Sequence, residues 1–198
     1  MQTDLIVAVY KENLNWLKSR ENPFETIYAY GKFHREDYKF VEYLPNIGRE
    51  SHTYIWHILK NYEKIESDYL MFLQGMPLAH IQAKIDSIGY SIFNNKYNLI
   101  HLFYPLGNCV LCDGRSQPFS PEDCKLYLFW DELFGYDMPE NFIANHGAQM
   151  IVHKSLILNR SKKFWEKALE LHYSYDIAPW AFEILWNNIF DPRCVSIN

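Results

Sequence analysis

The first half of this chain alternates short apolar runs with segments of helical period, and this alternation restricts the fold more than any other feature. Two segments with apolar residues three and four apart, 13–19 and 51–62, are predicted helices. Four runs rich in β-branched and aromatic residues are predicted strands: 4–10, 25–31, 37–44 and 68–73. The resulting order βαββαβ is typical of an α/β fold, with a mostly parallel central sheet and helices on both faces.

The second half continues with helices and strands around one long loop. Residues 105–121 are rich in Gly, Pro, Asp and Ser, which predicts a loop. Ser161 is an expected N-cap, and Pro179 fits the first turn of the last helix. The predicted helices are 79–88, 121–134, 160–173 and 179–190, and the predicted strands are 99–103 and 147–153.

Charge and hydropathy predict neither a nucleic-acid partner nor a membrane span. The formal net charge is -5, and no run of Lys or Arg is long enough to neutralise the phosphates of a duplex, so we expect no nucleic-acid partner. No stretch reaches the roughly 20 apolar residues of a membrane span, and residues 1–4 lack the basic start of a signal peptide. We expect a cytoplasmic protein with no transmembrane segment, for which peripheral membrane contact stays open. Its cysteines are expected as reduced thiols.

Sheets of this kind bind ligands at the carboxyl ends of their strands, so the residues that follow each strand are candidate site residues. They are Tyr10 to Glu12, residues 45–50, Gln74 to His80 and the loop around Asp113. The segment Asn46-Ile-Gly-Arg-Glu50 precedes a predicted helix, whose free amides and the Arg49 guanidinium suit a diphosphate. The alternative is a capping Glu50 beside a solvated Arg49.

Several short motifs occur in order along nearly the whole chain. The first is Val7-Ala-Val-Tyr10, followed by Trp16. The longest are Asn46-Ile-Gly-Arg-Glu-Ser-His-Thr-Tyr54 and Phe72-Leu-Gln-Gly-Met-Pro-Leu-Ala-His80. The others are Cys112-Asp-Gly114, Gly147-Ala-Gln149, residues 156–161, and Trp180-Ala-Phe-Glu183 with Trp186. By the order and spacing of these motifs the chain resembles a glycosyltransferase-like family that is described as a domain of unknown function.

The resemblance implies one GT-A-type, Rossmann-like domain over residues 1–198, with a nucleotide-binding half at 1–104 and an acceptor half at 105–198. It also implies a nucleotide-sugar and a glycan or glycolipid acceptor as partners. Similar families carry an Asn-x-Gly-Arg-Asp/Glu segment near the donor, which matches residues 46–50 here. The implied donor-binding residues are Tyr10, Glu12, Asn46, Gly48, Arg49, Glu50, Gln74, Gly75, His80 and Gln149.

The chain departs from the GT-A pattern at the metal site. Enzymes of this fold commonly hold Mg²⁺ or Mn²⁺ through an Asp-x-Asp motif, where this chain has Gln74-Gly75-Met76. A thioether does not replace a carboxylate as a ligand for these ions, so no metal ligand is predicted. Mn²⁺ or Mg²⁺ stays open as a cofactor, with His80 and Asp113 as the first ligands to consider. Ile184 also replaces an expected Arg.

Two carboxylates are candidate catalytic residues. An inverting sugar transfer needs a general base near the anomeric carbon of the donor, and Glu183 in the last predicted helix is the first candidate. Its structural alternative is a helix carboxylate that pairs with a core polar group. Asp113 is the second candidate, for which the alternative is a plain Asp-Gly turn.

The sequence therefore predicts a hexosyl-type glycosyltransferase in surface-polysaccharide synthesis. The first alternative is a non-catalytic sugar- or nucleotide-binding domain that kept the fold without its metal ligand. The second is an interaction module whose aromatic residues, 17% of the chain, form a partner surface. The glycine-rich motifs of dinucleotide binding, P-loop hydrolysis and an elbow nucleophile are absent.

Overall fold

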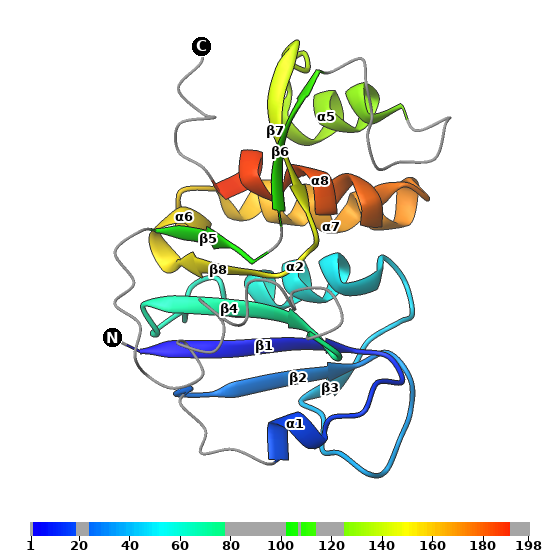
Figure 1. Cartoon of the computed structure of the whole chain (residues 1–198), viewed down its shortest axis with the longest axis vertical. Helices are drawn as coiled ribbons and strands as arrows, with labels where there is room; N and C mark the ends of the chain where they lie inside the picture. The colour runs from blue at the N-terminus through cyan, green and yellow to red at the C-terminus, as the bar shows by residue number, and fades with distance from the viewer. Residues whose placement is uncertain (1, 19–23, 78–101, 107, 114–124, 191–198) are drawn as a thin grey trace.

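The computed structural model describes residues 2–18, 24–77, 102–106, 108–113 and 125–190. Within these residues a six-stranded sheet has the strand order β3-β2-β1-β4-β8-β5, and a separate two-stranded ribbon pairs β6 with β7 (Figure 1). Helices pack against the sheet and the ribbon. The chain is therefore a mixed α/β protein with a mostly parallel central sheet, as its alternating pattern predicts.

The parallel part of the sheet is made by the first half of the chain. β1 (Thr3–Val9) pairs in parallel with β2 (Ile27–Gly31) on one side and with β4 (Tyr69–Gln74) on the other. β3 (Glu42–Tyr43) adds to the free edge of β2. The strand order thus reverses at β1, since the chain builds outward from β1 to β3 and then returns to the opposite side of β1 for β4.

One strand runs against the others. β8 (Met150–His153) is antiparallel to β4 and to β5 (Phe103–Pro105). Just before it, β7 (Asn141–His146) pairs with β6 (Asn108–Asp113) in the ribbon. The predicted loop at 105–121 is therefore wrong over residues 108–113. Its strand is held by a partner about thirty residues further on, which local composition does not reveal.

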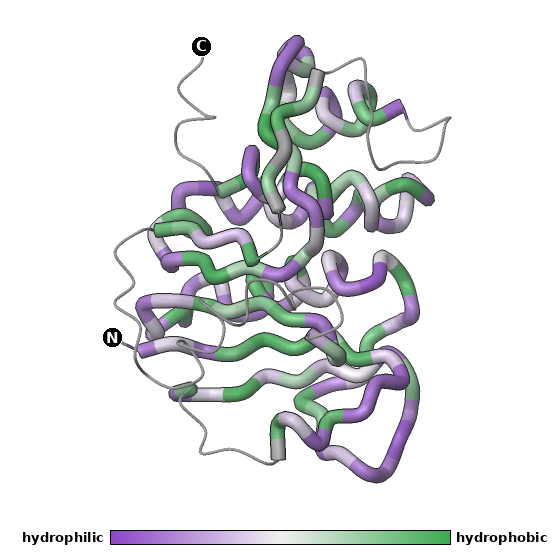
Figure 2. The backbone as a smooth tube through the Cα atoms, viewed as in Figure 1, coloured by the Kyte–Doolittle hydropathy of each residue, from purple (hydrophilic) through white to green (hydrophobic). Residues whose placement is uncertain are grey.

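Both faces of β1 are covered, which explains its continuous apolar sequence. Leu5, Ile6 and Val7 have no exposed surface. Ile6 belongs to a large core cluster with residues of the C-terminal helices, whereas Leu5 and Val7 join a smaller cluster with Leu14 on the opposite face. In Figure 2 the central strands are green along their buried lengths, and the loops beyond β2 are mostly purple.

The helices follow the predicted periodicity. α1 (Asn15–Lys18) is one turn, and α2 (Arg49–Asn61) packs on β1 and β4. α2 also contacts α7 and α8, so the two halves of the chain share the large core cluster. The bounds of the remaining helices are Leu126–Phe134 for α5, Lys154–Leu158 for α6, Lys162–Ser174 for α7 and Ala178–Phe190 for α8.

Several local expectations have a definite outcome. Ser161 caps α7, since its hydroxyl accepts from the backbone N–H of Phe164 at 3.2 Å. The predicted strand 37–44 is wrong except for the two residues of β3, because residues 33–40 form a mostly exposed loop with bends. The predicted helix 79–88 lies outside the described residues, as does the start of the predicted strand 99–103.

Candidate functional site

A cavity of about 500 Å³ opens at the carboxyl ends of β1 and β4, where the strand order reverses. This is the position at which open α/β sheets bind their ligands, because the connections on either side diverge there. Its lining comes from three strand ends and the start of α2: Ala8, Val9, Tyr10, Glu12, Lys32, Asn46, Gly48, Arg49, Glu50 and Gln74.

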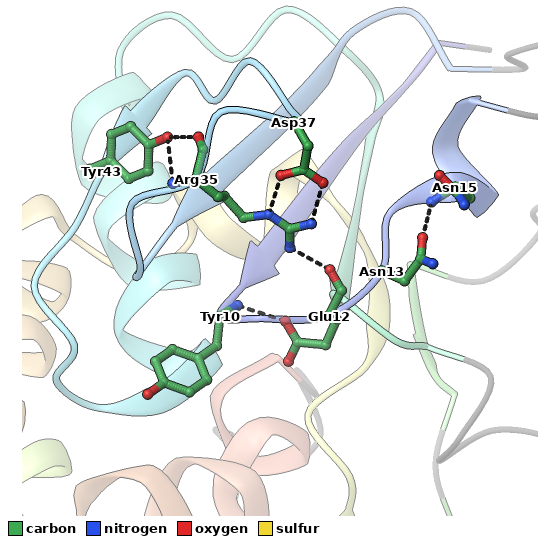
Figure 3. A network of polar contacts seen from close by, with 7 residues as sticks. All are labelled: Tyr10, Glu12, Asn13, Asn15, Arg35, Asp37 and Tyr43. Carbon is green, nitrogen blue, oxygen red and sulfur yellow. Dashed lines mark hydrogen bonds and ion pairs between the residues drawn. The ribbon is translucent and has the colours of Figure 1, made fainter.

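The wall beyond β1 is fixed by a polar network (Figure 3). The carboxylate of Glu12 accepts from the backbone N–H of Tyr10 at 2.6 Å, and the Glu12 carbonyl accepts from Arg35. Arg35 also forms a two-point ion pair with Asp37 in the loop after β2. These contacts join the loops that follow β1 and β2, so Glu12 is held against the cavity in one position.

Gly75 lies behind Glu12 and not in the cavity lining. A β carbon at Gly75 would lie 2.7 Å from Glu12 Oε2, so only glycine allows β4 to approach this carboxylate so closely. The Gly75 carbonyl accepts from the indole of Trp16 at 2.8 Å. Gly75 is thus a packing residue that supports the cavity wall.

The loop before α2 has an uncommon backbone. Gly48 and Arg49 both have positive φ, 63° and 46°, and a positive φ is rare for a residue with a side chain. The N-cap residue Gly48 has no side chain to cap α2, and in the first turn the Glu50 carboxylate accepts from its own backbone N–H. The remaining first-turn N–H groups of α2 have no intrahelical acceptor, and such groups suit an anion.

Gly48 is required by space as well as by conformation. A β carbon at this position would lie 2.2 Å from Cδ2 of His172 and 2.7 Å from Cβ of His52. His172 is itself fixed, because its ring stacks on Phe182 at 4.6 Å and its Nδ1–H donates to the Ala168 carbonyl at 3.0 Å. His172 of α7 therefore fixes the position of the loop at Gly48.

Arg49 extends from this loop and stacks on α8. Its guanidinium lies 4.6 Å from the ring centroid of Trp180, at the first turn of that helix. Stacking holds the plane of the guanidinium and leaves its N–H edge free for a planar anion. Among the described residues, no carboxylate lies within ion-pair distance of Arg49.

Two carboxylates interact through their charges at the same edge. Burial raises the pKa of Glu50, and the nearby charge of Glu183 raises it further. The side chain of Gln74 donates to Glu50 and opposes this shift. Glu183, half-buried on α8, is not among the lining residues, but its charge reaches Glu50 across the cavity edge.

Lys32 is the lining residue that sequence reasoning missed. It directly follows β2, is only 8% exposed, and donates through Nζ to the carbonyls of Pro45, at 3.3 Å, and Ile47. Burial lowers its pKa to about 8, against the opposing charge of Glu50. The strand-end rule, applied after Gly31 as it was after Tyr10 and Leu73, would have found it.

The implied donor residues separate into three groups. Tyr10, Glu12, Gln74 and the 46–50 segment supply seven lining residues: Tyr10, Glu12, Asn46, Gly48, Arg49, Glu50 and Gln74. Gly75 and Gln149 lie outside the lining: Gly75 packs behind Glu12, and Gln149 is buried and donates to the Pro77 carbonyl at 3.4 Å. His80 lies outside the described residues.

The sequence predicts that Asp113 lies in a loop. In the structure it is instead the last residue of β6. Its backbone pairs with Asn141, at the end of the ribbon opposite the Asn108–His146 pair that leads into β8. The long-loop interpretation of Asp113 is therefore corrected by the same β6–β7 pairing that overturns the loop at 105–121.

The described side chains contain no preassembled group of ligands for a divalent ion. In the part of the chain that the structure describes, no three His, Cys, Asp or Glu residues gather closely enough to hold a metal. Met76, in place of the expected carboxylate, points to solvent with 53% exposure. The carboxylates of Glu12 and Glu50 line the cavity, and neither belongs to a described group of three that could hold a metal by itself.

Among the described helices, none has the length and apolar character needed to cross a membrane. Comparison with protein-family models, curated proteins and solved structures finds no match to this chain. Interpretation of the cavity therefore rests on its own geometry.

Proposed function

We propose that this protein is a GT-A-like glycosyltransferase, which moves a sugar from a nucleotide-sugar to a glycan or glycolipid acceptor. The observation that carries the proposal is the cavity at the strand-order reversal, since it combines anion donors, two carboxylates and exposed rings. The motif resemblance supplies the reaction class. The sheet, with its single reversed strand β8, is compatible with that fold.

The donor diphosphate would lie against the loop before α2. The first turn of α2 and the stacked guanidinium of Arg49 lie at this loop, and both favour a negatively charged group. Tyr10 and Phe33, 40% and 48% exposed, meet edge to face beside the cavity with their centroids 6.1 Å apart. Exposed rings at this rim suit the flat faces of a base or a sugar.

The acceptor hydroxyl would approach from the α8 side. Glu183 takes the proton of this hydroxyl while its oxygen attacks the anomeric carbon of the donor sugar. The bond from that carbon to the diphosphate breaks, and the nucleoside diphosphate leaves with the electron pair. Burial raises the pKa of Glu50, and this carboxyl group would contact the ligand beside Glu183.

A thermal-shift panel of sugar nucleotides tests the proposal, run once with chelator and once with Mn²⁺. We expect at least one sugar nucleotide to raise the unfolding temperature in chelator, because Arg49 and backbone amides carry the anion contacts. A panel without any stabilising sugar nucleotide contradicts the proposal. Stabilisation that needs Mn²⁺ contradicts the metal-independent site.

Turnover of the stabilising donor then separates catalysis from binding. Glu183→Gln keeps the shape of the side chain but removes the base, so turnover should fall about a hundredfold or more with donor affinity nearly unchanged. Glu166→Gln, on the exposed face of α7, is the matched control. Equal turnover in the two variants returns Glu183 to a structural role.

A non-catalytic nucleotide-sugar-binding domain is the second candidate. It is favoured by the exposed Met76 where the fold commonly has an acidic ligand. Tight binding of a sugar nucleotide without transfer or hydrolysis over a broad acceptor panel would select it over the enzyme.

A further inference from the structure

We infer that Lys32 forms a second anion subsite on the β2 side of the cavity, where a phosphate group of the ligand supplies the counter-charge for its ammonium. The subsite is separate from Arg49, because the two cations come from different elements. Lys32 follows β2 in the main sheet, whereas Arg49 begins α2. The inference rests on the proposed function only for the identity of the natural anion.

The first argument is the position of the side chain. Lys32 is anchored at the end of β2 by its backbone N–H, which donates to the Val9 carbonyl at 2.8 Å. Its side chain is more than nine-tenths buried and lines the cavity. Long flexible lysines are rarely buried to this extent without a charged partner.

The second argument is hydrogen-bonding capacity. A lysine ammonium has three N–H donors, and the carbonyls of Pro45 and Ile47 take two of them. One donor is left for a ligand in the cavity. The same two contacts hold the loop that carries Asn46 and Gly48, so the ligand would meet the ammonium and the loop amides together.

The third argument is charge. Among the described residues, no carboxylate lies within ion-pair distance of Lys32. Glu50 acts on it from further away, and His52 and His172 face it as neutral rings, since burial lowers their pKa to about 3 and about 4. Burying a charge without a close partner is unfavourable, and an anion in the cavity removes that cost.

Sulfate is a suitable probe, because it stays fully ionised through the pH range in which Lys32 titrates. Anion binding to the ammonium must raise the pKa of Lys32, by linkage. The experiment follows the Lys32 side chain by NMR in the full chain with ¹³Cε-labelled lysine, with sulfate or with sodium chloride at the same ionic strength. Lys32→Met assigns the signal, and the exposed Lys60 of α2 is the internal control.

We expect sulfate to raise the pKa of Lys32 from about 8 by roughly one unit and to leave the Lys60 titration unchanged. Sulfate affinity should then fall about tenfold between neutral and strongly alkaline pH, since one pKa unit is a factor of ten. An unchanged Lys32 titration, at sulfate concentrations that shift the amide signals of Arg49 and Glu50, would overturn the inference.

The outcome is distinguishable from failure of the proposed function. If sulfate shifts Lys32 and no sugar nucleotide binds, the subsite stands and the glycosyltransferase proposal fails. If a sugar nucleotide binds without changing the Lys32 titration, the proposed function stands and the subsite is wrong. The titration uses the unsubstituted chain, so neither outcome depends on whether Lys32→Met folds.

Discussion

Helix α2 carries buried polar clusters at both of its ends, and they are built differently. The cavity-side cluster consists of Lys32, Ser51, His52 and His172, around the first turn of α2. The core-side cluster consists of Tyr30, His57 and Asn61, around its last turns. Both clusters contain histidines that are almost fully buried.

The core-side cluster satisfies its own polar groups. The Tyr30 hydroxyl lies 2.9 Å from Nδ1 of His57, and Asn61 Nδ2 donates to the His57 carbonyl at 2.9 Å. Because burial lowers the pKa of His57 to about 3, the ring is neutral and Nδ1 accepts. This arrangement has the features of a structural network.

The cavity-side cluster leaves capacity unused. Lys32 keeps one N–H and an unpaired charge, and Nδ1 of His52 has no hydrogen-bond partner among the described residues. Ser51 Oγ lies 2.8 Å from the Gly48 carbonyl and 2.8 Å from His172 Nε2, which ties the cluster to the loop of positive φ. Both clusters bury polar groups, but only the cavity-side cluster has hydrogen-bonding groups without partners among the described residues. Such unpaired groups beside a cavity distinguish a candidate binding site from a structural network.

Acid should destabilise both clusters, and this is the largest expected effect. The folded pKa values of His52, His57 and His172, about 3, 3 and 4, lie below the ordinary value of 6.5. The unfolded chain therefore binds more protons below pH 6.5, so stability is full above that pH and falls toward pH 4. Between about pH 7.5 and 5.5 the loss should be roughly 1 kcal/mol for each ring, or about 3 to 4 kcal/mol in all.

Urea unfolding at the two pH values measures this loss. His57→Asn should remove about a third of it, whereas His34→Asn, at an exposed position, should remove none. Glu50 and Asp4 act in the opposite direction to the histidines. Burial raises the pKa of both carboxylates, so their protonation in the folded state stabilises the protein as the pH falls. A stability that increases on acidification would show that these carboxylates outweigh the rings.

Gly48→Ala should disrupt the cavity-side cluster alone. The new β carbon is strained by the positive φ and collides with His172, so we expect a loss of about 3 kcal/mol in the free energy of unfolding. Gly135→Ala is the matched control: φ is 75° there, but nothing lies within 4 Å, so the loss should be about 1 kcal/mol. Equal losses in denaturant unfolding would mean that the loop moves freely away from α7.

Arg49→Ala should weaken anion binding without changing the core-side cluster. Alanine keeps the strained backbone but removes the stacked guanidinium, so affinity for the stabilising sugar nucleotide, measured by calorimetry, should fall about tenfold to thirtyfold. Lys60→Ala removes the same charge from the far end of α2 and should change affinity less than twofold, because exposed charges are screened. An unchanged affinity of a folded Arg49→Ala protein would exclude Arg49 as a phosphate ligand.

Tyr30→Phe should produce the smallest effect and confine it to stability. Loss of the hydroxyl removes one buried hydrogen bond to His57. The free energy of unfolding, measured in urea, should therefore fall by about 1 kcal/mol. Affinity for sulfate and for sugar nucleotides should stay the same. A change in ligand affinity would show that the two clusters are coupled along α2 and would break the comparison.

Much of the cavity was predictable because strand ends can be read from local pattern. The apolar run that ends at Val9 and the one that ends near Gln74 located two walls, and the glycine before the helix at residue 49 located the third. Lys32 was missed because the strand-end rule was not applied after Gly31, where a single lysine matches no motif. Its importance depends on the carbonyls of Pro45 and Ile47, which only folding brings to it.

Non-local pairing explains the other errors. The β6 strand resembles a loop in sequence, and its identity depends on β7 about thirty residues later. Likewise, His172 is more than a hundred residues from Gly48 in sequence, yet its ring fixes the depth of that loop. Spacing rules applied within one segment do not detect contacts of this kind.

The sequence by itself determined the α/β class, the parallel order of the first half and the strand ends at which a ligand would bind. These properties follow from hydrophobic period and from the turn residues, which act over a few neighbours. The tertiary structure decided the position of β8, the charge interaction of Glu183 with Glu50, the stacking of Arg49 on Trp180 and the burial of Lys32. The physical reason is that charge, pKa and orientation depend on which distant side chains exclude water from a group, and this is settled only when the helices pack on the sheet.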